Sequence, residues 1–244
     1  MIHPTARGFA AAADVYERAR PDYPAATLDH IVEVLGLDPG AHVVDLGAGT
    51  GKLTRDLVSR GFRVTAIEPL RGMRELLASA LPEAVVVEGT AEAIPLEDAT
   101  VDAVTIAQAF HWFDPEPALA EVQRVLRRGG LVALVWNVRD QTHPVHQRYA
   151  EVIRDYRGGD YPEMQGHARY LANSPLFDGY EEHEFRHAQM LDADGLVARA
   201  QSVSFIAALP EDERAELLER VRALAPPGTF EFPYVTKVFT GHSR

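Results

Sequence analysis

Apolar residues recur along the first half of the chain in two alternating patterns. One pattern is the short, mostly apolar run, as in HVVDL (42–46), RVTAI (63–67), AVVVE (84–88), VDAVTIA (101–107) and LVALVWN (131–137). Such runs predict strands that are buried on both faces. The other pattern, apolar residues three or four positions apart, predicts helices over 24–36, 52–61, 70–82 and 115–130.

This alternation predicts the fold. Strands that alternate with helices imply right-handed crossovers and a parallel sheet covered on both faces, which is a doubly wound, Rossmann-like α/β domain. Two later runs, YEEHEFRHAQM (180–190) and FEFPYVTKVFT (230–240), also resemble strands. Placed at the sheet edge, they complete a seven-stranded, mostly parallel sheet with helices on both faces and a small helical cap.

The length of 244 residues suits one domain, 1–244, which we divide into four segments. Residues 1–36 are expected to form an N-terminal helical cap segment, and 37–137 the ligand-binding core. Residues 138–180, with scattered His, Arg, Tyr, Gly and Pro, are expected to form a cap insertion. Residues 181–244 then supply the sheet-edge strands and helices.

Composition narrows the classes of function. The chain has no cysteine, which excludes disulfides, thiolate zinc sites and cysteine nucleophiles. A formal net charge of -12 and the lack of a dense Lys/Arg cluster argue against nucleic acid as a partner. The chain has no apolar run of membrane-spanning length, no basic amphipathic helix for a membrane surface and no secretion signal. We therefore expect a cytoplasmic protein, monomer or homodimer, that acts on a small molecule.

The turn LGAGTG (46–51) carries the first indication of a ligand. Gly47, Gly49 and Gly51 allow unusual dihedral angles and close approach of a ligand to the main chain. A phosphate loop needs Ser or Thr after its lysine, and here Leu53 follows Lys52. A dinucleotide fold needs G-x-G-x-x-G, whereas this turn reads G-x-G-x-G. The alternative is a tight strand-to-helix turn that binds no ligand.

Several segments together resemble the class I S-adenosylmethionine-dependent methyltransferases. They are VVDLGAGTGKLT (43–54), IEP (67–69), GTAEAIPL (89–96), AQAFHWFD (107–114) and LRRGGLVALVWN (126–137). The opening VYERARPDYP (15–24) resembles the branch of small-molecule methyltransferases that includes the trans-aconitate type. The likeness covers most of the chain.

The resemblance implies a set of S-adenosylmethionine contacts. The methionine part would lie at Asp45 and the backbone of Gly47, Ala48, Gly49 and Gly51, and the ribose at Glu68 with Pro69 beside it. Adenine would lie between Ala91 and Glu92, although many relatives have aspartate at the position of Thr90. Gln108 and Ala109 would flank the sulfonium, and Tyr16 and Arg20 would close over the cofactor.

The acceptor side is less defined by the sequence. His111 has an imidazole suited to act as a general base or to orient the acceptor, or it is simply buried under the cap. The substrate pocket is expected to include Tyr23, Trp112, Trp136 and Asn137. His143 and His146 lack a third ligand nearby, so no metal site is predicted.

The sequence therefore predicts an S-adenosylmethionine-dependent methyltransferase acting on a small-molecule acceptor. The acceptor atom is undetermined and includes a carboxylate, because the displacement chiefly requires alignment of the reactants. Two alternatives remain at this point. One is a nicotinamide-dependent oxidoreductase, and the other is a protein that binds S-adenosylmethionine without turnover.

Overall fold

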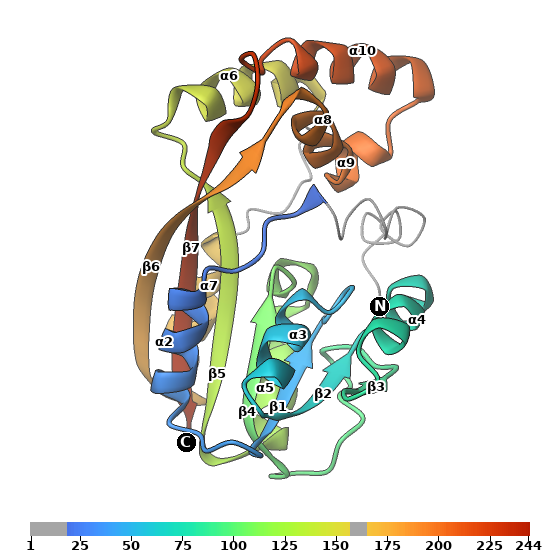
Figure 1. Cartoon of the computed structure of the whole chain (residues 1–244). Helices are drawn as coiled ribbons and strands as arrows, with labels where there is room; N and C mark the ends of the chain where they lie inside the picture. The colour runs from blue at the N-terminus through green and yellow to red at the C-terminus, as the bar shows by residue number, and fades with distance from the viewer. Residues whose placement is uncertain (1–18, 157–164) are drawn as a thin grey trace.

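The computed structural model describes residues 19–156 and 165–244 (Figure 1). Its strands are β1 (His42–Leu46), β2 (Arg63–Ile67), β3 (Val85–Val87), β4 (Val101–Ala107), β5 (Leu126–Arg139), β6 (Phe177–Leu191) and β7 (Phe230–Ser243). The longer helices are α2 (Ala25–Leu35), α3 (Lys52–Ser59), α4 (Arg71–Ala80), α5 (Pro115–Val125), α6 (Pro144–Ile153), α8 (Ala193–Gln201) and α10 (Glu211–Arg222). The shorter ones are η2 (Phe110–Trp112), η3 (Arg154–Tyr156), η4 (Gln165–His167), α7 (Ala168–Ala172) and α9 (Ser204–Ala207).

All seven strands form one sheet in the order β3-β2-β1-β4-β5-β7-β6. The first five are parallel, whereas β7 runs antiparallel to both β5 and β6. The predicted α/β fold with a mostly parallel sheet is confirmed, and the two late strands occupy the predicted edge. Because β1 to β5 are parallel, the loops that follow them all lie along one edge of the sheet.

The predicted helix over 115–130 is too long. α5 ends at Val125, and the Leu-Arg-Arg-Gly-Gly run that follows belongs to β5. The pairing of β4 with β5 shifts register between Val101 and Ala103, which makes room for the extra residues. Two glycines permit this, since Gly129 has φ 76° and a β-carbon on Gly130 would lie 2.9 Å from the Asp102 carbonyl oxygen.

Two layers of helices cover the sheet. On one face α5 and α7 bury the side chains of Val44, Ile106 and Leu134, and on the other α2 and α3 cover Val43 and Val64. The adjacent residues Val43 and Val44 therefore belong to different cores, as the alternation of side chains along a strand requires. For this reason β1 carries apolar side chains on both faces. Its one acid, Asp45, lies near its carboxyl end.

A helical cap stands beyond the carboxyl edge of the sheet (Figure 1). β5, β6 and β7 are the long strands of the sheet, with 14, 15 and 14 residues. The ends of β6 and β7 continue into the cap, where a separate core joins α6, α8, α9 and α10 to Phe232 and Tyr234. The cap thus draws on residues before and after β6. By contrast α7, inside the stretch 138–180, packs on the sheet.

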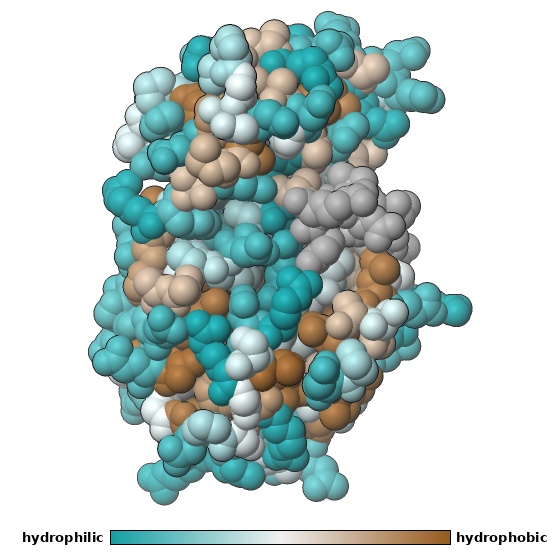
Figure 2. Space-filling view, viewed as in Figure 1, coloured by the Kyte–Doolittle hydropathy of each residue, from teal (hydrophilic) through white to brown (hydrophobic). Residues whose placement is uncertain are grey.

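The face of the molecule shown in Figure 2 is largely polar. Figure 2 shows hydrophilic residues over most of the face in view, on the cap and on the sheet part, with hydrophobic residues in small separated groups. Among residues 19–156 and 165–244, no helix is both long enough and apolar enough to cross a lipid bilayer.

Candidate functional site

The glycine turn after β1 is held closely by the strands beside it. The N–H groups of Gly47 and Ala48 both donate to the carbonyl oxygen of Ile67, at 2.8 and 3.1 Å. The three glycines have φ angles of 72°, 59° and 91°. These left-handed conformations explain the glycine at each position, because other residues adopt them only with strain.

The three glycines differ in what a β-carbon at each position would contact. A β-carbon on Gly47 would meet the Ala109 side chain at 2.7 Å, and one on Gly51 would meet Leu77 at 3.0 Å. At Gly49 the nearest atom is the Met73 sulfur, at 3.9 Å. Close packing within the protein thus accounts for the missing side chains at Gly47 and Gly51, whereas a β-carbon on Gly49 would make only an ordinary van der Waals contact.

Asp45 lies directly below this turn and is only 1% exposed. Its Oδ2 accepts a hydrogen bond of 2.6 Å from the hydroxyl of Thr54, on the first turns of α3. Its Oδ1 is buried and has no hydrogen-bond partner among the described residues. Desolvation raises the pKa of Asp45 to about 7, with the Thr54 hydrogen bond acting in the opposite direction.

Glu68, just after β2, is 4% exposed and is fixed by two main-chain hydrogen bonds. Its Oε2 accepts from the N–H of Gly49 at 2.9 Å, and its Oε1 accepts from the N–H of Leu70 at 2.8 Å. Burial raises the pKa of Glu68, and the two N–H groups lower it. The structure therefore brings the predicted carboxylate and the predicted glycine turn into direct contact.

Four other residues expected near S-adenosylmethionine lie in the loops that follow β1, β2 and β3. Ala48 and Pro69 are half-buried in the two adjoining loops. Ala91 is buried in the sheet core, and the carboxylate of Glu92 accepts a hydrogen bond from the N–H of Asp114 at 3.0 Å. Glu92 therefore links the loop after β3 to the start of α5.

The end of β4 carries a strained residue. Gln108 has φ 56°, one of two non-glycine residues with positive φ in the described chain, and its N–H donates to the Val135 carbonyl. Its side-chain amide donates to the Asn137 carbonyl at 3.5 Å. Its neighbour Ala109 is the residue that packs on Gly47. Left-handed conformations of such residues cost free energy and concentrate at ligand sites.

His111 lies on the short helix η2 and is 6% exposed. Its Nδ1 accepts a hydrogen bond of 3.3 Å from the indole N–H of Trp136. Trp136 is fully buried in the sheet core, where its ring packs edge-on against Phe239, whereas Trp112 is half-buried beside His111. Because an indole N–H only donates, a neutral His111 in this contact carries its proton on Nε2.

The segment before α2 crosses the end of β5. The Asn137 amide donates to the carbonyl oxygens of Pro21 and Asp22, at 3.4 and 3.3 Å. Arg20 donates to the Ser202 carbonyl of the cap at 2.7 Å, and Tyr23 packs on the core beneath α2. The remaining predicted residue, Tyr16, lies outside the described residues.

Two supporting residues were not predicted. Thr54 holds Asp45, and Arg74 donates from one guanidinium nitrogen to the carbonyl oxygens of Glu68 and Pro69, at 3.0 and 3.1 Å. Both lie on helices one or two turns after the motif they support. Their positions in the first turns of α3 and α4 are the only indication the sequence offers.

The two histidines of HPVHQ each make a hydrogen bond within the protein. His143 accepts a hydrogen bond from the N–H of Val145, and His146 is hydrogen-bonded to the Pro233 carbonyl. Within the described part of the chain, no three histidine or acidic residues gather closely enough to hold a metal ion.

Comparison with known proteins assigns the family. Residues 44–134, from β1 into β5, match a family model described as a methyltransferase domain. An uncharacterized methyltransferase of Mycobacterium bovis is 40% identical over 235 residues, which cover 93% of this chain and 92% of that protein. The chain belongs to the class I S-adenosylmethionine-dependent methyltransferases. This assignment favours methyl transfer over the nicotinamide-dependent chemistry left open by the sequence.

Solved structures of methyltransferases share the fold. A putative methyltransferase from an antibiotic biosynthesis pathway of Anabaena variabilis superposes with a TM-score of 0.66 at 21% identity, over 91% of this chain and 98% of that one. A geranyl diphosphate methyltransferase in complex with S-adenosylmethionine gives 0.51 at 15% identity, over 90% and 85% of the two chains.

Proposed function

We propose that this methyltransferase binds S-adenosylmethionine at the carboxyl edge of β1, β2 and β4 and transfers its methyl group to a small-molecule acceptor. The observation that carries the proposal is the buried Asp45, whose Oδ1 has no partner among the described residues beneath a glycine turn. A buried polar atom without a partner is costly, and an ammonium group on a ligand would remove that cost. The solved family structure with S-adenosylmethionine supports the choice of ligand.

The residues present fit this cofactor. Asp45 and the open side of Gly49 would receive its amino-acid end. Each Glu68 oxygen accepts one main-chain N–H and keeps a second acceptor site, so the carboxylate can also accept the two ribose hydroxyls. When bound, S-adenosylmethionine supplies a methyl group on a sulfonium, and the thioether S-adenosylhomocysteine leaves.

The chain's own task is to align the acceptor and exclude water. Gln108 would line the site beside the sulfonium. Its left-handed backbone conformation is held by hydrogen bonds to β5. We assign His111 the role of an N–H donor that orients the acceptor, since Trp136 occupies its Nδ1 and leaves the proton on Nε2. A general base would need a free lone pair on the nitrogen that faces the acceptor.

Calorimetry with S-adenosylhomocysteine and with NADH tests the cofactor. We expect micromolar binding of S-adenosylhomocysteine and none of NADH. Glu68→Gln should weaken that binding about tenfold to a hundredfold, because the amide offers one acceptor oxygen instead of two. Glu75→Gln, an exposed surface acid on α4, is the matched control and should bind as the wild type does. Binding of NADH alone would refute the proposal.

Turnover separates an enzyme from a protein that only binds. With a labelled methyl donor and a panel of small acids, alcohols and amines, we expect transfer of label to at least one class. His111→Gln keeps an N–H donor and should retain most of the rate, whereas His111→Phe should lose it. An equal loss of rate in both variants would instead indicate that His111 acts as a general base.

A further inference from the structure

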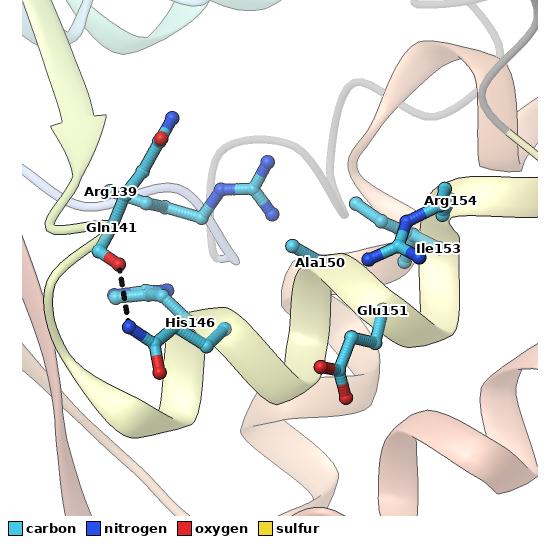
Figure 3. Close-up of a pocket in the computed structure, with 8 residues that line it drawn as sticks. Arg139, Gln141, His146, Ala150, Glu151, Ile153 and Arg154 are labelled. Carbon is cyan, nitrogen blue, oxygen red and sulfur yellow. Dashed lines mark hydrogen bonds between the residues drawn. The ribbon is translucent and has the colours of Figure 1, made fainter.

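The cap holds a cavity of about 660 Å³ beyond the end of β5 (Figure 3). Arg139, His146 and Arg154 are among the residues that line it. The Arg139 guanidinium lies 4.8 Å from the centre of the Tyr149 ring, and the His146 imidazole is hydrogen-bonded to the Pro233 carbonyl oxygen at 2.6 Å. These two polar groups are thus engaged within the cap.

The outer strand β6, by contrast, has a free side. It stands at the end of the strand order, at the margin of the sheet in Figure 1, and pairs with β7 along Phe177–Leu191. Within 19–156 and 165–244, no other main-chain hydrogen bond reaches residues 181–190. Every second residue of a strand directs its N–H and C=O away from a given neighbour, so about half of these residues present unpaired main-chain groups. Such a row is a template for a further strand.

The even-numbered side chains of β6 form an exposed strip on one face of the sheet. The strip consists of Tyr180, Glu182, Glu184, Arg186, Ala188 and Met190. Tyr180 stacks on the Phe239 ring, and Glu184 lies 2.6 Å from Lys237 on β7. Tyr180 is 38% exposed and Met190 is 60% exposed, which makes them two of the four large apolar side chains that are well exposed in the described chain. The strip thus has one exposed apolar side chain near each end.

The order of residues along this strip is self-complementary. When two β6 strands pair antiparallel about a two-fold axis at Phe185, residues equally far before and after 185 lie opposite each other. Glu184 of one copy then lies opposite Arg186 of the other, and Tyr180 lies opposite Met190. An axis one residue earlier or later would instead place two Glu184 or two Arg186 side chains opposite each other, which is unfavourable.

Both charged side chains can also bind a second copy. Arg186 is 72% exposed and uses one guanidinium nitrogen on Asp140, at 2.8 Å, which leaves its other N–H groups as donors. Glu184 uses Oε1 on Lys237, and its second oxygen remains an acceptor. Lys237 also pairs with Glu182 at 3.2 Å, so it offsets part of the acidic charge of the strip.

We propose that β6 is a dimer interface, at which two copies of this chain pair antiparallel about Phe185 and join their sheets into one continuous sheet. Main-chain hydrogen bonds between the two strands supply affinity, and the Glu184–Arg186 pairs fix the register. The Tyr180–Met190 contacts bury the two exposed apolar side chains of the strip. This interface is independent of the cofactor site and of the proposed methyl transfer.

Sedimentation velocity of the full chain tests the interface. From about 1 to about 100 μM protein, we expect the mass to rise from the 26.9 kDa of one chain toward twice that value. Met190→Glu places an acid opposite Tyr180 and should weaken the dimer about tenfold or more. Leu76→Glu on α4 and Val85→Glu on β3 change exposed apolar residues elsewhere and should leave the dimer unchanged. Since β3 is the other outer strand, loss of the dimer in Val85→Glu alone would overturn the assignment.

Exchange of the two charges tests the register. Glu184→Arg and Arg186→Glu should each weaken the dimer about tenfold, because each places like charges opposite one another. The double variant, Glu184→Arg with Arg186→Glu, should recover most of the affinity. If these residues acted only within one copy, through Lys237 and Asp140, the double variant would instead form the weakest dimer of the three.

Hydrogen exchange of the wild type locates the interface without any substitution. Amide exchange within residues 181–189 should slow as the protein concentration rises through the dimerisation range. A dimer that leaves exchange in this stretch unchanged would place the interface elsewhere. A mass that stays at one chain up to about 100 μM would overturn the proposal outright.

Discussion

The sheet edge and the cap differ in the ionisable groups that they bury. At the sheet edge the acids Asp45 and Glu68 are buried together with the imidazole of His111, and in the cap Arg199 and His146 are buried. Burial raises the pKa of Asp45 to about 7 and lowers that of His146 to about 4. The same desolvation thus disfavours the charged form on both sides.

The two regions also differ in how they are assembled. At the sheet edge Asp45 is in β1 and is held by the Thr54 hydroxyl, nine residues on, and Glu68 directly follows β2 and is held by two main-chain N–H groups. In the cap, Arg199 on α8 is held by the hydroxyl of Tyr234 on β7, and Arg20 by the Ser202 carbonyl, 182 residues away. The sheet edge is therefore a local structure, and the cap depends on contacts between distant segments.

The largest expected effect is at the glycine turn. Gly47→Ala places a β-carbon 2.7 Å from the Ala109 side chain in a left-handed conformation. We expect it to lower the free energy of unfolding by roughly 3 to 4 kcal/mol, measured by urea denaturation. Gly49→Ala is strained but unobstructed and should cost roughly 1 to 2 kcal/mol. Equal losses would show that conformation alone, and not packing on Ala109, sets the turn.

Asp45 should make the sheet edge less stable as pH rises. Its folded pKa of about 7 exceeds the ordinary 3.8, so between these values the folded chain retains a proton that the unfolded chain has lost. From pH 5 to pH 8 the wild type should lose about 2 to 3 kcal/mol relative to Asp45→Asn. A parallel pH dependence of the two proteins would refute this burial effect.

His146 should act in the opposite direction. Because its folded pKa lies below the ordinary 6.5, the unfolded chain takes up a proton first, and stability falls as pH drops from 6.5 to about 4. Relative to His146→Phe, the wild type should lose about 2 kcal/mol between pH 7 and pH 4.5. If both lose the same stability, some other group dominates the acid response of the cap.

Asn137, near the end of β5, holds the segment before α2 in place. Its amide binds two carbonyls of the segment before α2, and its Oδ1 accepts from the Thr236 hydroxyl at 2.6 Å. Asn137→Ala should cost about 2 kcal/mol and increase amide hydrogen exchange at Asp22 and Tyr23. The exposed Asn173→Ala should change neither. Unaltered exchange in Asn137→Ala would mean that other contacts hold this segment.

The smallest effect is expected on the outside of the cap. Arg222 pairs with Asp194 at 2.6 Å, and both side chains are well exposed. Exposed ion pairs contribute little, so Arg222→Ala should leave the free energy of unfolding nearly unchanged in urea denaturation. A larger loss would show that α8 and α10 need this pair in addition to their apolar contacts.

Much of the sheet could be read directly from the sequence. The runs at 42–46, 63–67 and 101–107 became β1, β2 and β4 with the predicted bounds. Periodicity succeeded here because each strand is buried on both faces and each helix covers it through one apolar stripe. It failed at 126–130, where a register shift and two glycines extend β5 in place of a helix end.

The sequence by itself determined the family, the order of the elements and the positions of Asp45, the glycine turn and Glu68. Asp45 lies in β1, and the glycine turn and Glu68 directly follow their strands, so local order along the chain fixes their places. Only the tertiary structure decided that Gly47 and Gly51 make room for Ala109 and Leu77, that Trp136 lies behind His111, and that Arg139, His146 and Arg154 share one cavity. These arrangements depend on contacts between separate elements, which no periodicity in the sequence records.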